Sequence, residues 1–213
     1  MIATVIGSTG LTGLALVRQL LADSAIAEVI SISRKPPGLS NAKLTEVLVA
    51  DLMELPSVES KVRGEVYFCC LGTTIKAAGS KENFEKVDHA AILEFAKIAK
   101  AHDAKSFVLI SAMGANARST FFYNQVKGRT ENDVKALGLR SLIIFRPALL
   151  VGPRREFRLG ERVAAWALVP ISRLLPSQIR KLFITNVETL AARMLSEGKA
   201  GRAGVEVISA KSI

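Results

Sequence analysis

Two side chains that can move a proton lie four residues apart, as Tyr123 and Lys127 of the segment Tyr-Asn-Gln-Val-Lys. The segment begins an expected helix, and four residues make about one helical turn, so the phenol and the ammonium share a face. A tyrosine with a pKa of about 10 is a poor acid or base at neutral pH unless a cation stabilises its anion. The pair predicts acid–base catalysis. The alternative is an ordinary surface pair, because this spacing is common in helices.

A hydroxyl that could orient a substrate carbonyl follows the expected strand 106–110. Ser111 ends this strand, at the carboxyl edge where α/β sheets place their ligands. Ser119 or Thr120 could supply the hydroxyl instead, and Ser111 could also be a simple turn or cap residue. We predict a catalytic set of Ser111, Tyr123 and Lys127.

A glycine-rich turn near the start of the chain predicts a dinucleotide site. Gly7 allows a sharp exit from a buried strand, Gly10 allows the backbone to approach a pyrophosphate, and Gly13 allows close helix packing. The free amides and the positive end of the following helix would hold the phosphates. The alternative is a tight turn that binds nothing. The residues predicted to bind here are Gly7, Ser8, Thr9, Gly10, Leu11, Thr12 and Gly13.

Two basic residues end the second strand, where a cofactor with an unphosphorylated ribose would call for an acid. Arg34 offers a planar donor fork and Lys35 a second charge, which suits a 2′-phosphate. The pattern predicts NADP(H) rather than NAD(H). The alternative is an exposed basic loop before Pro36.

Other cofactor contacts are predicted at the ends of later strands. Asp51 could touch the adenine edge, or it could simply begin the next turn. Gly72 and Thr73 follow the fourth strand, where the sheet edge would meet the ribose and the nicotinamide. The predicted cofactor contacts are completed by Leu71, Tyr123, Lys127 and Pro147.

These features occur in the order and spacing of the short-chain dehydrogenase/reductase superfamily, which the chain resembles over nearly its whole length. It resembles most narrowly the Tat-interacting protein family, an atypical branch. The resemblance implies a Rossmann fold with NADP(H), Tyr123 as the general acid/base, Lys127 on the nicotinamide ribose and Ser111 at the carbonyl. One departure is Leu71-Gly72-Thr73-Thr74, where many members carry the Asn-Asn-Ala-Gly that supports their proton relay. The residues that carry the narrower resemblance are Cys69–Thr74, Ala78-Gly79, Phe84, Val87-Asp88, Tyr123–Gly128 and Phe145-Arg146-Pro147.

Apolar runs alternate with helical patterns along the chain. The runs are continuous rather than alternating, which predicts strands covered on both faces. The order therefore predicts an α/β fold with a doubly wound parallel sheet in one domain, residues 1–213, with 152–185 as a small substrate-side region. The expected strands are 3–6, 29–33, 46–50, 66–71, 106–110, 142–145 and 205–208, and the expected helices are 13–22, 82–101, 121–137 and 186–197.

Composition narrows the class of protein further. The chain has 213 residues, which fits one large domain, and only two cysteines, which are neighbours in an apolar run. Neither histidine has a partner at a metal-ligand spacing, so no metal is predicted. No export signal and no membrane span are expected either. We therefore expect a soluble protein of the cytoplasm.

A net charge of +10 is concentrated late in the chain, since residues 146–213 carry 12 Lys and Arg against 5 Asp and Glu. A basic cluster with one interleaved aromatic residue predicts weak phosphate attraction and no specific nucleic-acid binding. The favoured function is an NADP(H)-dependent oxidoreductase acting on an unidentified alcohol or carbonyl. The alternative is a nucleotide-sensing regulator that binds a protein partner, as animal members of the resembled family are associated with transcription and transport control. The cluster consists of Arg154, Arg155, Arg158 and Arg162.

Overall fold

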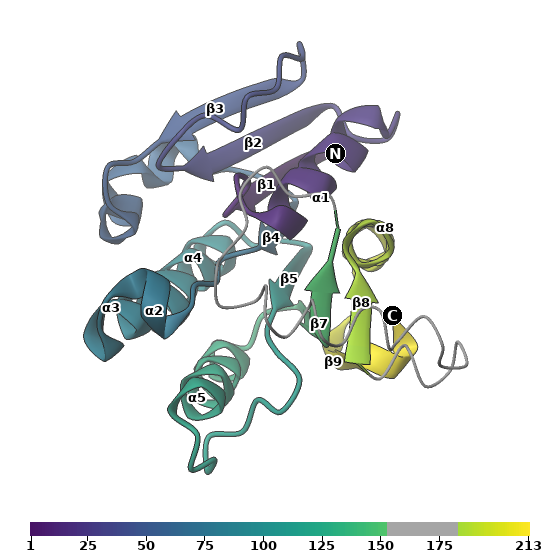
Figure 1. The fold of residues 1–213 in the computed structure, drawn as a ribbon. Helices are drawn as coiled ribbons and strands as arrows, with labels where there is room; N and C mark the ends of the chain where they lie inside the picture. Colours follow the sequence, from purple (N-terminus) through teal and green to yellow (C-terminus); the bar gives the residue numbers. More distant parts are fainter. Residues whose placement is uncertain (153–182) are drawn as a thin grey trace.

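The computed structural model describes residues 1–152 and 183–213 (Figure 1). Most of the predicted substrate-side region 152–185 therefore lies outside the described residues. The same holds for the cluster Arg154, Arg155, Arg158 and Arg162.

A seven-stranded sheet forms the centre of the fold, in the order β3-β2-β1-β4-β5-β6-β9. Every neighbouring pair is parallel. The order reverses between β1 and β4, so the carboxyl ends of these two strands flank the point where such sheets bind ligands. The strands are β1 Ile2–Ile6, β2 Glu28–Ser33, β3 Leu44–Leu48, β4 Val66–Cys69, β5 Ser106–Ile110, β6 Ser141–Arg146 and β9 Gly204–Ser209.

Helices cover both faces of the sheet (Figure 1). Strand side chains alternate between two apolar cores: Val5 packs toward α1 and α8, whereas Ile6 packs toward α4. This is why the strands read as continuous apolar runs, and the predicted doubly wound parallel sheet is confirmed. The α-helices are α1 Leu11–Ala22, α2 Ile75–Ala78, α3 Lys81–Glu85, α4 Ala91–Ala101, α5 Phe122–Ala136 and α8 Val187–Ala200.

The predicted helix 82–101 is present but is not one regular α-helix. A π-helix, Lys86–Ala90, lies between α3 and α4. Single turns of π-helix inside α-helices occur often at functional sites.

Two further differences from the expected elements concern short or edge segments. The strand expected at 46–50 lies at 44–48, because β3 is an edge strand whose Glu46 and Leu48 are exposed, so burial does not mark its bounds. Residues Leu52–Lys61 form a 3₁₀-helix that the sequence did not indicate.

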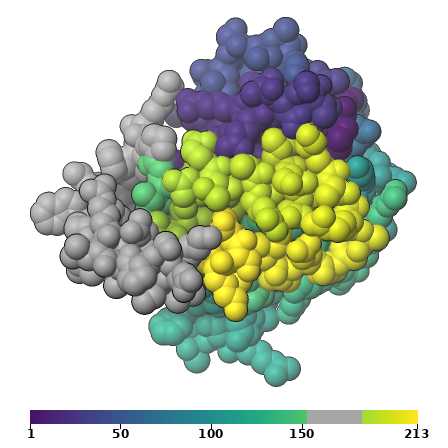
Figure 2. Space-filling view, turned by 90° about the vertical axis from the view of Figure 1, so that its right-hand side faces the viewer, coloured from purple at the N-terminus to yellow at the C-terminus, as the bar shows by residue number. Residues whose placement is uncertain are grey.

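Helices α1 and α8 lie side by side although about 170 residues separate them (Figure 2). Leu16 and Leu20 of α1 share a core with Leu190 and Met194 of α8. At the ends of the contact, Lys199 forms an ion pair with Asp23 at 2.6 Å. The helix that follows the glycine turn is therefore held in place by α8, near the end of the chain.

A second, two-stranded sheet joins β7, Leu149–Val151, to β8, Ile184–Asn186, in parallel. It holds together the two described ends of the predicted substrate-side region. Across residues 1–152 and 183–213, no helix has the length and apolar character that crossing a bilayer requires.

Candidate functional site

The glycine turn between β1 and α1 has the backbone geometry that its spacing predicts. Gly7 adopts a φ of +79°, a left-handed conformation that side chains disfavour. A Cβ on Gly13 would lie 2.2 Å from the Gly7 carbonyl oxygen, so only glycine lets α1 approach the turn this closely. The Gly10 amide donates to the same carbonyl at 3.0 Å, and Gly10 begins the helix.

The amino end of α1 follows directly on the glycine turn. Within the described residues, no side chain caps this end. Uncapped amides at the positive end of a helix dipole attract phosphate. Ser8 and Thr12 are buried, and the Ser31 hydroxyl donates to the Ser8 hydroxyl at 2.7 Å, which anchors the turn to β2. Thr9 is exposed and Leu11 is half-buried.

A small pocket of about 140 Å³ opens at the ends of β2 and β3. Arg34 and Asp51 line it, as does Lys86 from the π-helix. Asp51 also accepts a hydrogen bond from the Met53 amide at 3.0 Å, so it begins the next turn as well as facing the pocket. Lys35 is exposed and does not line the pocket; its carbonyl accepts from the Ser33 hydroxyl.

A buried ion pair lies beside the end of β4. The Lys127 ammonium nitrogen is 2.7 Å from Asp88 Oδ1, and the two side chains are 4% and 0% exposed. Asp88 Oδ2 accepts the Thr73 amide at 2.8 Å. A Cβ on Gly72 would lie 3.8 Å from the Lys127 nitrogen, so the loop after β4 passes close to the pair. The structure thus brings Gly72, Thr73 and Lys127 together, and the surface-pair alternative does not hold for Lys127.

The charge of Lys127 is stabilised in this position. Burial is the largest single influence on its pKa and favours the neutral amine. The charge of the Asp88 carboxylate, the tyrosinate form of Tyr123, the hydrogen bond to Asp88 and the thiolate form of Cys69 all favour the ammonium, and the pKa of Lys127 lies above its usual value. The side chain is therefore an ammonium at neutral pH, as stabilisation of a tyrosinate requires.

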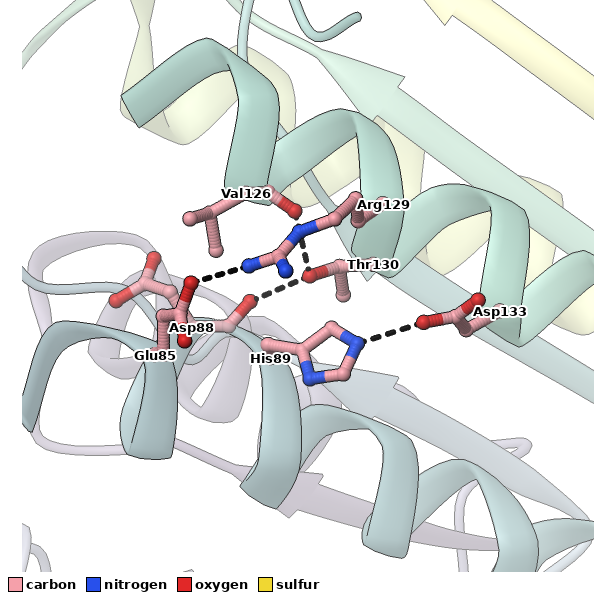
Figure 3. A network of polar contacts seen from close by, with 7 residues as sticks. All are labelled: Glu85, Asp88, His89, Val126, Arg129, Thr130 and Asp133. Carbon is pink, nitrogen blue, oxygen red and sulfur yellow. Dashed lines mark hydrogen bonds and ion pairs between the residues drawn. The ribbon is translucent and has the colours of Figure 1, made fainter. Parts of the chain in front are cut away.

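Contacts between the π-helix and α5 fix the placement of Asp88 (Figure 3). The Thr130 hydroxyl lies 2.8 Å from the Asp88 carbonyl oxygen and 2.9 Å from the Val126 carbonyl oxygen, so it bridges the two elements. Farther out, Arg129 pairs with Glu85, and His89 lies 2.6 Å from Asp133. These contacts hold the wide turn of the π-helix against α5.

Tyr123 lies in the first turn of α5, half-buried, with its ring centroid 5.6 Å from that of Phe84. It is within electrostatic range of Lys127, since its charge affects the pKa of that lysine. The predicted proton donor and its cation therefore lie on one helix at the ligand edge of the sheet.

Ser111 has a strong partner inside the protein. Its hydroxyl donates to Glu131 Oε1 at 2.6 Å, and Arg146 binds the same buried carboxylate through two nitrogens at 2.6 and 2.9 Å. Ser111 is 6% exposed. Its hydrogen is thus directed toward Glu131. Pro147, the residue after Arg146, is buried and its carbonyl accepts the Met113 amide.

The remaining candidates have structural surroundings. Burial raises the pKa of the Cys69 thiol to about 12. It also raises the pKa of the Cys70 thiol well above its usual value. His102 Nδ1 lies 2.9 Å from the Tyr67 hydroxyl. In the part of the chain that the structure describes, no three His, Cys, Asp or Glu side chains gather as metal ligands do.

Three charged residues of this site were not predicted as site residues. In the sequence Asp88 belongs to the motif Val87-Asp88, and Lys86 and Glu131 carry no signal of their own. An aspartate among the apolar residues of 84–98 was the available clue, because a buried carboxylate needs a cationic partner.

A parallel sheet with an uncapped glycine turn at its reversal point defines the class of dinucleotide-binding Rossmann proteins. The chain matches the family described as NAD(P)H-binding over residues 7–173. It is 41% identical to "Protein FMP52-1, mitochondrial" of Scheffersomyces stipitis over 72% of this chain and 69% of that protein. It is 40% identical to "Protein fmp52, mitochondrial" of Emericella nidulans over 75% of this chain and 71% of that protein. The chain belongs to this NAD(P)H-binding family, with the FMP52 proteins as relatives.

Solved structures agree on the fold. A short chain dehydrogenase family protein from Francisella tularensis superposes with a TM-score of 0.69 at 15% identity, over 99% of this chain and 98% of that one. At this identity the likeness establishes the architecture alone.

The predicted cytoplasmic location is wrong by these comparisons. Both relatives are named as mitochondrial proteins, and so are others of similar identity. Composition could not have shown this, because the choice of compartment is not a property of the folded core.

Proposed function

We propose that the protein is an NADP(H)-dependent oxidoreductase that passes a hydride between its cofactor and an alcohol or carbonyl substrate. The cofactor supplies the hydride, and the protein supplies orientation and a proton. In this proposal Tyr123 is the general acid/base, Lys127 holds the nicotinamide ribose and stabilises the tyrosinate, and the turn from Gly7 to Gly13 holds the pyrophosphate. These roles match those that the resemblance to the short-chain dehydrogenase/reductase superfamily implies.

The observation that carries the proposal is the buried, charged Lys127 one helical turn after Tyr123. An ammonium is costly to bury, so a surface-type role would not place it there. Its position beside Gly72 puts it at the ligand edge of the sheet, where a cation can act on both a bound ribose and a phenol.

The preference for NADP(H) rests on the charges around the pocket at the ends of β2 and β3. Arg34 and Lys86 line it from two different elements. One charge-assisted contact to a 2′-phosphate can supply about 1.4 kcal/mol, or tenfold in affinity.

Two measurements on the purified protein test the proposal. Calorimetric titration should show NADPH binding at least ~10-fold more tightly than NADH. A panel of carbonyls and alcohols, followed by NADPH absorbance, should then reveal turnover. Equal affinities would remove the NADP(H) preference, and binding without turnover on a broad panel would remove the enzyme.

The second candidate is a nucleotide-sensing regulator that binds a protein partner and turns nothing over. One observation favours it: the Ser111 hydroxyl donates its hydrogen to the Glu131 carboxylate, so this hydrogen is not directed toward a substrate carbonyl. Turnover on the panel separates the two functions, because the regulator binds NADPH without turning over any substrate. If turnover is found, Ser111→Ala tests the role of this hydroxyl: a carbonyl-orienting role predicts a lower rate, whereas a structural role leaves the rate unchanged. The mitochondrial names of the relatives make the mitochondrion the compartment in which to test either function.

A further inference from the structure

Asp88 is a buried carboxylate for which the proposed chemistry has so far named no role. It is fully buried on the π-helix and contacts two parts of the site, the Thr73 amide and the Lys127 ammonium. Taking a carboxylate and an ammonium out of water costs several kcal/mol per ion before their attraction is counted. A pair held at this cost beside a ligand edge calls for a role in the site's chemistry.

The two charges depend on each other. Without a counter-ion, a lysine as deeply buried as Lys127 favours its neutral form, because burial is the largest influence on its pKa. A neutral amine cannot stabilise a tyrosinate. The carboxylate at 2.7 Å therefore decides whether the cation exists when Tyr123 gives up its proton.

We infer that Asp88 is a positioning residue whose carboxylate keeps Lys127 as a fixed ammonium beside Tyr123. This inference rests on the proposed function for its meaning in catalysis, but its physical content can be tested without cofactor or substrate. It also assigns a purpose to the π-helix, which presents Asp88 to α5 while Thr130 holds its carbonyl (Figure 3).

Other ionisable groups near the pair do not replace Asp88. Cys69 is the further group on β4 that acts on Lys127, and its raised pKa keeps it a neutral thiol until about pH 12. Glu85 at the end of α3 pairs with Arg129 of α5, and His89 of the π-helix pairs with Asp133 of α5. These groups are partly exposed and occupied by each other, whereas Asp88 contacts Lys127 directly.

The chain offers a clean readout, because it contains only two tyrosines, Tyr67 and Tyr123. Burial, followed by the charge of Glu59, raises the pKa of Tyr67 far above the usual range. Phenolate absorbance over the range where an ordinary tyrosine titrates therefore reports Tyr123. The Tyr123→Phe variant should lose this transition, which confirms the assignment.

The decisive variant is Asp88→Asn, which keeps the shape of the side chain and an oxygen for the Thr73 amide. We expect the transition of Tyr123 to move upward by about one pH unit or more, because Lys127 loses its proton first and no longer stabilises the phenolate. If Lys127 stayed charged regardless, removal of a nearby negative charge would move the transition downward. A downward shift or no shift would overturn the inference.

Asp133→Asn is the matched control, since it removes a carboxylate from the same interface that pairs with His89 rather than with Lys127. In Asp133→Asn, the phenolate transition of Tyr123 should occur at the same pH as in the wild type. Circular dichroism of each variant checks that it is folded.

A measurement on the wild type keeps the inference testable if Asp88→Asn does not fold. Nitrogen NMR of labelled lysines, with Lys127 assigned through Lys127→Arg, follows the protonation of its amine. The ammonium should persist to a higher pH than the Tyr123 transition, and its loss at a lower pH would overturn the inference. Neither readout uses NADPH or a substrate, so failure of the inference is distinct from failure of the proposed function.

Discussion

The two halves of the ligand edge use different chemical groups: backbone amides around β1 and β2, and charged side chains around β4, β5 and α5. Around β1 and β2, the turn from Gly7 to Gly13 offers backbone amides, and its shape depends on the absence of side chains. Around β4, β5 and α5, the site depends on charged side chains held out of water. The buried charged residues within 1–152 and 183–213 are Asp88, Lys127, Glu131 and Glu197, and the first three lie in this second half.

The difference reflects what each half has to do. A phosphate needs fixed donors, and backbone amides at a helix end are fixed by the fold itself. A proton transfer needs a group whose charge can change, and its pKa has to be set by neighbouring charges in a region of low water content. A side chain added to the glycine turn should therefore impair phosphate binding, whereas removal of a buried charge should impair proton transfer.

The largest effect is expected for Lys127→Met, which leaves Asp88 buried without a partner. Breaking a buried pair from one side costs about 3–5 kcal/mol. Urea unfolding measures the loss. Arg129→Met is the matched control, because it removes a partly exposed pair on the same helix and should cost less than about 1 kcal/mol. Similar losses in both variants would contradict the view that burial distinguishes the second half.

Tyr123→Phe should cost turnover rather than stability. The phenol proton is needed only in the transition state, so the rate should fall by about a hundredfold or more, while NADP(H) affinity stays nearly unchanged. Steady-state rates and cofactor titrations on one substrate from the panel provide the test. An unchanged rate would remove Tyr123 from the catalytic role.

Gly13→Ala tests the half built from backbone. Its new Cβ would meet the Gly7 carbonyl oxygen at 2.2 Å, so we expect the free energy of unfolding to fall by about 2 kcal/mol. Gly10→Val is the companion variant: its Cβ has more room, at 3.2 Å from that oxygen, so the fold should survive while cofactor binding is lost. Wild-type affinity in Gly10→Val would place the phosphates elsewhere.

Arg34→Ala should have the smallest effect, a loss of about tenfold in the preference for NADPH over NADH. Lys35→Ala serves as its control, because Lys35 does not line the pocket. Calorimetry with both cofactors measures the preference. An equal loss in the two variants would show that general positive charge, and not a contact from Arg34, sets the preference.

The strands of the sheet were predictable from the sequence because their signals are local. Runs such as Phe107–Leu109 are apolar on both faces, and the glycine spacing reflects contacts within a few residues. The partners of Lys127 and Ser111 were not predictable in this way. Asp88 of the π-helix contacts Lys127 of α5, and Glu131 of α5 contacts Ser111 at the end of β5. Both contacts depend on tertiary packing.

The packing of α1 on α8 also constrains how the chain folds. Residues of α1 complete their apolar core only with Leu190 and Met194, which are synthesised about 170 residues later. Contacts between segments so far apart are formed late and slow the folding of parallel sheets. During synthesis, the glycine turn therefore emerges early but lacks the helix that holds α1 in place. Chaperone dependence, and protection of the turn by NADP(H) once the last helix has emerged, are the expected signs of this order of assembly.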